Sequence, residues 1–136
     1  MNNIEQTLSI IKPDAVERNL DNEIKVIFKN KGFKIIKEKK LKLEKSEAEQ
    51  FYKVHETKPF YNDLCEYLSS GTVVVMILEK ENAIKSNRDL MGATDPNKAK
   101  EGTIRKLYGK SIDKNSVHGS DSPENAKKEI DFFFKN

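Results

Sequence analysis

The sequence predicts an α+β fold in which helices cover one face of a mostly antiparallel, four-stranded sheet. Two observations support this prediction. Four short apolar or β-branched runs alternate with segments of helical periodicity, in the order β-α-β-α-α-β-α-β-α. The chain has 136 residues, which is enough for one hydrophobic core and leaves little room for a second. We therefore expect a single domain over residues 1–136, and the sequence contains no internal repeat, linker or low-complexity segment.

The first predicted strand covers residues 7–11 (TLSII), a β-branched run that ends at a turn containing proline. Apolar residues then recur at helical spacing between Ile24 and Phe28, and Gly32 is expected to end that helix. A second strand is predicted over residues 33–43 (FKIIKEKKLKL), where apolar residues alternate with charged ones. Its lysines are expected to form a solvated face of the strand rather than a binding patch.

Two helices and a buried strand are predicted next. Ser46, with Glu49 three residues later, forms a capping-box pattern at the start of one helix, and a second helix is expected over residues 61–68. The run TVVVMIL over residues 72–78 is the most apolar segment of the chain. Because it shows no alternation with polar residues, it predicts a strand that is buried on both faces.

The last part of the chain is predicted to contain two helices, a helical turn and a strand. A helix is expected over residues 81–91, followed by a loop rich in turn-forming residues (TDPNKAKEG) and a short helical turn over residues 103–108. Residues 116–118 are predicted to form a last short strand. The sequence Ser122-Pro123-Glu124 then predicts a helix start, with serine as N-cap, proline at the first position and an acid in the first turn.

The composition narrows the possible classes of protein. Charged residues make up 35% of the chain and apolar residues 36%, so the core is thin and contacts between subunits are expected to supplement it. The net charge of +3 is too small to imply nucleic-acid binding but suits anionic small molecules. Cys65 is expected to be a buried, inert thiol. The N-terminus has no signal-peptide pattern and no apolar run is long enough to span a bilayer, so we expect a cytoplasmic protein.

Several common catalytic motifs are absent from the sequence. It contains no P-loop, GxGxxG, HExxH or GxSxG pattern, no paired cysteine ligands and no RNA-binding aromatic motif. Two histidines are too few for a multi-histidine metal site. Only three of the 25 basic residues are arginines (Arg18, Arg88 and Arg105), and the planar guanidinium group binds phosphate in a way that lysine does not. For each arginine alone, a structural salt bridge is the more common role.

His118 lies among small polar residues in the segment NSVHGSDS. Gly119 and Ser120 are expected to leave open space beside the imidazole ring. A carboxylate from Asp121 or Glu129 would fix the tautomer and leave the other ring nitrogen free for nucleophilic attack. The local sequence leaves a structural and a reactive role of this histidine equally open.

The decisive evidence is a resemblance that extends over nearly the whole chain. The segments IIKPDAV, KGF, KPFYNDL, SGTVVVMILEKENAI, NRDLMGATDP, EGTIR and NSVHGSDS resemble, in order and spacing, the nucleoside diphosphate kinase family. The last segment is similar to the active-site signature of that family and is highly specific. The resemblance implies a ferredoxin-like βαββαβ sandwich with additional helices. It also implies a Mg²⁺-dependent, ping-pong transfer of the γ-phosphate from a nucleoside triphosphate, typically ATP, to a nucleoside diphosphate.

The resemblance also implies a role for individual residues. His118 matches the phosphorylated histidine, and Glu129, helped by Ser120, matches the carboxylate that orients it. Asp121 is then expected to be a structural partner. The remaining matches are Tyr52 near the transferred phosphate, Lys12 and Asn115 at the ribose and phosphates, Arg88, Arg105 and Thr94 at the phosphates, and Phe60 and Ile112 on the two faces of the base. Mg²⁺ is expected to be held mainly by the nucleotide phosphates and water, without a protein cage.

Two departures from the family pattern and two alternatives accompany this interpretation. Lys58 stands where many members have arginine, which places a bidentate contact there in doubt. The chain ends at Asn136, as in bacterial members with a short C-terminus, and so a tetramer and a hexamer built from similar dimers both stay open.

The alternatives are a catalytically silent nucleotide-binding regulatory homologue and a basic nucleic-acid-binding module. The complete set of matching residues argues against the first, and neither a membrane nor a nucleic acid is an expected partner.

Overall fold

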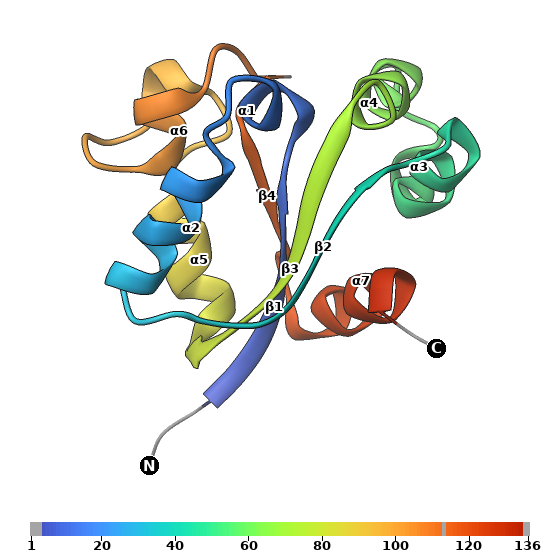
Figure 1. The fold of residues 1–136 in the computed structure, drawn as a ribbon. Helices are drawn as coiled ribbons and strands as arrows, with labels where there is room; N and C mark the ends of the chain where they lie inside the picture. The colour runs from blue at the N-terminus through green and yellow to red at the C-terminus, as the bar shows by residue number, and fades with distance from the viewer. Residues whose placement is uncertain (1–3, 113, 135–136) are drawn as a thin grey trace.

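The computed structural model describes residues 4–112 and 114–134, so both ends of the predicted domain lie outside the described residues. Its centre is an antiparallel sheet with the strand order β2-β3-β1-β4, as Figure 1 shows. The strands are β1 (Ile4–Ile11), β2 (Lys34–Lys42), β3 (Thr72–Glu81) and β4 (Val117–Gly119). The predicted α+β class and the four-stranded antiparallel sheet are confirmed.

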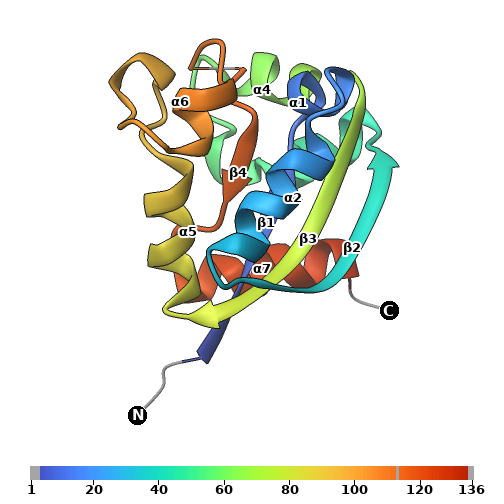
Figure 2. The ribbon, with the colours of Figure 1, turned by 60° about the vertical axis from the view of Figure 1, so that its left-hand side comes forward.

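Helices cover both faces of the sheet, so the prediction that they cover one face is wrong (Figures 1 and 2). One face carries α2 (Asp21–Asn30) and α5 (Ala83–Met91), and the other carries α3 (Lys45–Phe51), α4 (Tyr61–Leu68) and α7 (Pro123–Phe134). The reason lies in β3, whose side chains alternate between two separate cores. Val74 and Met76 belong to one core, and Val73 and Val75 to the other. Each apolar face needs its own layer of helices.

Short helical segments connect these elements. The turn predicted after the first strand is instead the start of helix α1 (Pro13–Glu17). Its proline occupies the first helical turn, where a missing N–H has no intrahelical partner to lose. The predicted helical turn over residues 103–108 is confirmed as α6 (Ile104–Tyr108), and 3₁₀ turns cover Lys53–His55 and Pro96–Lys98.

The helix boundaries follow local capping chemistry. The predicted capping box of Ser46 and Glu49 is wrong, because Glu44 and Glu47 form the box and α3 begins at Lys45. The backbone N–H of Glu44 donates to the Glu47 carboxylate at 2.9 Å. At α7 the predicted N-cap is confirmed, since the Ser122 hydroxyl accepts from a backbone N–H of the first turn at 3.1 Å.

The sheet has one solvated edge strand. Most residues of β2 are exposed, as predicted for its lysine-rich sequence, and two apolar side chains beside them, Val26 on α2 and Ile36 on β2, are also exposed.

Glu81 belongs to β3 rather than to the helix predicted over residues 81–91, which begins at Ala83. Cys65 is a buried free thiol, as expected. Among the described residues, no helix is both long and apolar enough to cross a membrane.

Candidate active site

His118 occupies the middle of β4, where its backbone pairs with Ile10 of β1. Its side chain faces the layer formed by α3 and α7, whereas Val117 on the preceding position belongs to the opposite core. The imidazole is partly accessible, with 22% of the side chain exposed. The short edge strand β4 therefore presents a partly exposed imidazole ring to the layer formed by α3 and α7.

Glu129 on α7 fixes one edge of that ring. Its Oε1 lies 3.0 Å from Nε2 of His118 and accepts a hydrogen bond of 2.8 Å from the Ser120 hydroxyl. Ser120 is fixed in turn, since its Oγ accepts from the backbone N–H of Leu8 on β1. A carboxylate at Nε2 favours the tautomer in which Nε2 carries the proton, so Nδ1 keeps its lone pair. No described residue hydrogen-bonds to Nδ1.

Phe51, which sequence reasoning missed, packs against the imidazole. The two rings meet edge to face with centroids 5.4 Å apart. Phe51 also contacts Phe132 and Phe133 of α7, so it links α3 to the helix that carries Glu129. The only sequence signal for this role was its place directly before Tyr52.

Tyr52 lies beside the same cluster and is largely buried. Burial raises the pKa of its hydroxyl well above the ordinary value, and the nearby Cys65 and Glu129 raise it further. The phenol therefore stays protonated at any physiological pH. It can act as a hydrogen-bond donor to an anion but not as a base.

Two of the three arginines, Arg88 and Arg105, lie near each other. Arg105 is 8% exposed, and its guanidinium donates to the backbone carbonyls of Gly92 at 3.0 Å and of Val117 at 2.9 Å. Burial, and then the neighbouring Arg88 cation, lower the pKa of Arg105 to about 10, which leaves it charged at neutral pH. Arg88 on α5 is exposed and donates no hydrogen bond to a described residue. The pair concentrates positive charge near β4, the strand that carries His118.

Lys12 and Asn115 meet at the C-terminal end of β1. The Lys12 ammonium donates to the Asn115 side-chain oxygen at 2.9 Å, and the Asn115 amide donates to the backbone carbonyl of Thr94 at 3.1 Å. The structure thereby brings together three residues that are up to 103 positions apart in sequence. Lys12 and Asn115 are both buried, and Thr94 is exposed.

Phe60 and Ile112 are exposed apolar side chains, with exposed fractions of 44% and 55%. Phe60 is connected to the cluster through a row of aromatic rings, since His55 lies 6.1 Å from both Tyr52 and Phe60. The Lys58 ammonium lies 5.7 Å above the Phe60 ring. A solvent-facing aromatic ring flanked by a cation is suited to stacking with a planar ligand.

Gly119 does not leave room beside the imidazole, contrary to the prediction. A Cβ built at this position would lie 2.3 Å from Asn87 Nδ2 and 2.8 Å from Met91 Cε. The glycine is therefore needed for the close packing of α5 on β4. Asp121 is a structural partner as expected: its Oδ1 accepts from the Asn125 amide at 2.6 Å, which lowers the pKa of the carboxyl.

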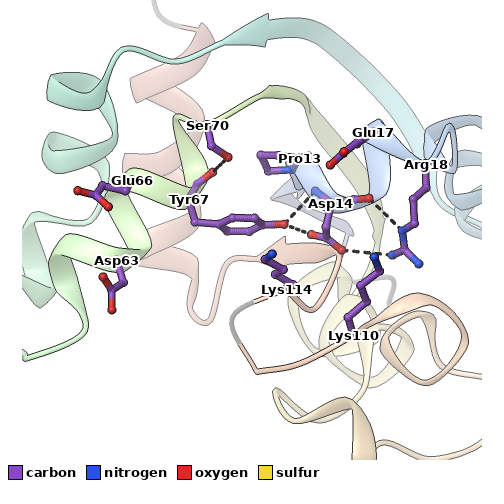
Figure 3. Close-up of a pocket in the computed structure, with 10 residues that line it drawn as sticks. All are labelled: Pro13, Asp14, Glu17, Arg18, Asp63, Glu66, Tyr67, Ser70, Lys110 and Lys114. Atoms are coloured by element: carbon purple, nitrogen blue, oxygen red, sulfur yellow. Dashed lines mark hydrogen bonds and ion pairs between the residues drawn. The ribbon is translucent and has the colours of Figure 1, made fainter.

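A cavity with a volume of about 610 Å³ does not include His118. It lies between α1, α4 and the loop after α6, and Figure 3 shows Tyr67, Asp14 and Arg18 joined along one wall. Arg18 is the third arginine and has a structural role, because it bonds Asp14 and the backbone carbonyl of Tyr108 at 2.6 Å. The predicted site residues around His118 therefore do not line this cavity.

The side chains of the site determine how it could bind a metal ion. Across residues 4–112 and 114–134, no three His, Cys, Asp or Glu side chains are grouped so that they could hold a metal ion. The site is instead rich in cations. A divalent ion fits such a site when phosphate oxygens and water supply its ligands.

Comparisons with known proteins give a consistent result. A family model described as nucleoside diphosphate kinase matches residues 5–136. The nucleoside diphosphate kinases of Persephonella marina and Campylobacter hominis are 57% and 58% identical over 131 residues, which cover 96% of this chain and 94% and 96% of those proteins. The solved structure of the Aquifex aeolicus nucleoside diphosphate kinase aligns with a TM-score of 0.95 and 41% identity, covering 98% of this chain and 96% of that one. The enzyme from Encephalitozoon cuniculi aligns with a TM-score of 0.93 and 37% identity, covering 97% and 90%.

Proposed function

The chain belongs to the nucleoside diphosphate kinase family, and from this premise we propose that His118 is the residue that carries the phosphoryl group. The enzyme transfers the γ-phosphate of a nucleoside triphosphate to a nucleoside diphosphate. In this proposal Nδ1 of His118 attacks the γ-phosphorus, and the bond from phosphorus to the bridging oxygen of the donor breaks. The donor leaves as a diphosphate, and the phosphohistidine then passes its phosphoryl group to the second diphosphate.

The observation that carries the proposal is the hydrogen bond between Nε2 of His118 and Glu129. It favours the tautomer in which Nδ1 is the nucleophile, and the carboxylate stabilises the positive charge that develops on the ring during attack. Ser120 holds the carboxylate, and Phe51 limits rotation of the imidazole. A ring that is already held in the reactive orientation loses less conformational entropy when it reacts.

Arg88, Arg105 and Thr94 are proposed to bind the phosphates. The Arg105 guanidinium is held by two backbone carbonyls, so its charge is preorganised near the phosphoryl group. In a loose phosphoryl-transfer transition state, catalysis consists mostly of positioning and charge stabilisation, which fits a cluster of fixed cations. Tyr52 adds a hydroxyl donor that stays protonated.

Lys12 and Asn115 are proposed to hold the ribose hydroxyls, with the Lys12 ammonium also near the phosphates. Phe60 and Ile112 are proposed to cover the two faces of the base, which is supported by their exposure on the rim of the site. Stacking carries no donor–acceptor code, so all four bases and both sugars are expected substrates. This breadth suits an enzyme that balances the pools of ribo- and deoxyribonucleoside triphosphates.

The reaction requires a divalent cation, and we propose Mg²⁺. When bound, the ion neutralises charge on the phosphates, and the cation-rich donor set of this chain leaves its coordination to phosphate oxygens and water. Residues 1–136 are proposed to work as one domain in the cytoplasm. We also propose a homo-oligomer, a tetramer or hexamer built from dimers, which light scattering would identify; the exposed edge strand β2 and the apolar Val26 and Ile36 beside it support subunit contacts there.

The test is covalent labelling with γ-labelled ATP in the absence of an acceptor diphosphate. The label is expected to be acid-labile and base-stable, and to be lost in His118→Ala. His55→Ala is the matched control, because the chain has only these two histidines, and this variant should keep the label. Label that survives acid, or that persists in His118→Ala, would refute the proposed nucleophile.

A further inference from the structure

Ser116 lies between Asn115 and the strand that carries His118, and its backbone is strained. Its φ of +76° falls in a region that residues other than glycine rarely adopt. The N–H of Val117 donates to the carbonyl of Asn115 at 2.9 Å, which closes a three-residue γ-turn around Ser116. Because such a conformation is unfavourable in isolation, the surroundings must hold it in place.

A buried polar cluster holds the Ser116 side chain, which is itself fully buried. The Ser116 hydroxyl donates to Oδ2 of Asp14 at 3.0 Å, and Nη2 of Arg18 lies 3.3 Å from both that hydroxyl and the same carboxylate oxygen. The Tyr67 hydroxyl donates to the other carboxylate oxygen and accepts from the backbone N–H of Asp14 at 2.9 Å. Figure 3 shows this row of Tyr67, Asp14 and Arg18 along the wall of the 610 Å³ cavity.

The backbone of the same turn is joined to the other side of the site. The carbonyl of Ser116 accepts from the N–H of Lys12 at 2.8 Å, and the Lys12 ammonium bonds the Asn115 side chain. Lys12 and Asp14 are separated by one residue, Pro13, whose ring fixes the local backbone. The segment 12–14 therefore holds both parts of Ser116: Lys12 binds its backbone carbonyl, and Asp14 binds its hydroxyl.

We propose that Ser116 is a positioning residue for phosphoryl transfer, and that the Asp14 carboxylate holds it in the strained turn that places Asn115 and His118. This inference rests on the proposed roles of Asn115 and His118. Ser116 itself is not proposed to touch a reacting atom. Its effect on the reaction passes through the residues before and after it in the chain.

Two substitutions separate the hydroxyl anchor from the backbone conformation. Ser116→Ala removes the hydrogen bond to Asp14 and keeps the side-chain penalty at positive φ, so the turn should relax and displace Asn115. We expect the phosphorylation rate of His118 by ATP to fall roughly 10-fold and KM for the nucleotide to rise several-fold. Ser116→Gly also lacks the anchor but adopts positive φ without steric cost, so its rate should stay within roughly 3-fold of wild type.

The matched control is Ser9→Ala, which removes another fully buried serine hydroxyl, one with no hydrogen-bond partner among the described residues. It should leave kcat and KM unchanged. Asp14→Asn is tested in a double-mutant cycle with Ser116→Ala, and the effect of the alanine on kcat should largely disappear in the asparagine background. Should Asp14→Asn fail to fold, Tyr67→Phe takes its place, because it removes a donor to the same carboxylate.

The outcomes are distinct. If the turn has only a structural role, Ser116→Ala and Ser116→Gly will lower Tm while both keep wild-type kcat and KM, and the inference is overturned. Additive effects in the cycle overturn the link to Asp14. Failure of the proposed function looks different, since wild-type protein would then carry no label on His118 at all.

Discussion

The hydrogen bond that Glu129 accepts from Nε2 of His118 predicts a specific kinetic defect in Glu129→Gln. The amide oxygen of glutamine can still accept from Nε2, so the tautomer and orientation of the ring persist while the negative charge is lost. At the observed 3.0 Å, two full charges would interact by about 5.5 kcal/mol at an effective dielectric constant of about 20. The imidazole carries only part of a charge in the transition state, and about a fifth of each side chain is exposed (22% and 19%).

We therefore expect Glu129→Gln to lose about 2 kcal/mol of transition-state stabilisation. This corresponds to a roughly 30-fold slower phosphorylation of His118. Quenched-flow labelling by γ-labelled ATP, without an acceptor, measures this step directly. Glu124→Gln is the matched control, because it removes the same charge from an exposed position of the same helix. A rate for Glu129→Gln within 3-fold of wild type, or an equal loss in Glu124→Gln, would refute the charge-stabilisation argument.

Three further predictions concern neighbouring residues. Arg105→Ala should lower kcat more than about 100-fold, which turnover measures. It should also lower the free energy of unfolding, measured by urea titration, by about 1–3 kcal/mol, since a buried carbonyl (Val117) and a partly buried one (Gly92) lose their donor. Gly119→Ala should lower stability by about 1–3 kcal/mol, because its Cβ would meet Asn87; an unchanged Tm would contradict this. Asp121→Asn should lower Tm at pH 7. The hydrogen bond from Asn125 lowers the pKa of Asp121, so the ionised carboxylate stabilises the fold above the ordinary carboxyl pKa. This contribution disappears in strong acid, where wild type and Asp121→Asn should have the same Tm.

Local chemistry in the sequence predicted most of the elements. Helix α4 was predicted over the residues it occupies, 61–68, and the apolar run of β3 was identified as a strand buried on both faces. The serine–proline–glutamate start of α7 was equally clear. These features depend on contacts within a few residues, so periodicity and capping patterns are enough to predict them. The start of α3 was predicted wrongly, because two capping boxes are possible within one turn. The sequence pattern favoured Ser46, whereas Glu44 is the N-cap in the structure.

The candidate site depended on more than local patterns. The residues around His118 left its role undecided, and the match of spaced motifs over the whole chain supplied the assignments of Glu129 and Arg105. The structure brings Glu129 within hydrogen-bond distance of the ring, but it also gives Gly119 a packing role that its position beside the histidine did not suggest. The only sequence signal for Phe51 was its place directly before Tyr52, and a phenylalanine on a short helix most often belongs to the core.

The sequence by itself predicted the fold class and most of the strand and helix segments, and the family resemblance supplied the proposed residues of the site. Only the tertiary structure decided that helices cover both faces of the sheet and that Asp14 reaches Ser116, which is 102 residues away. It alone showed that Arg105 is held by backbone carbonyls. The physical reason is that such contacts arise when the sheet closes and its two cores pack, and no periodicity of apolar residues encodes which buried polar groups will meet.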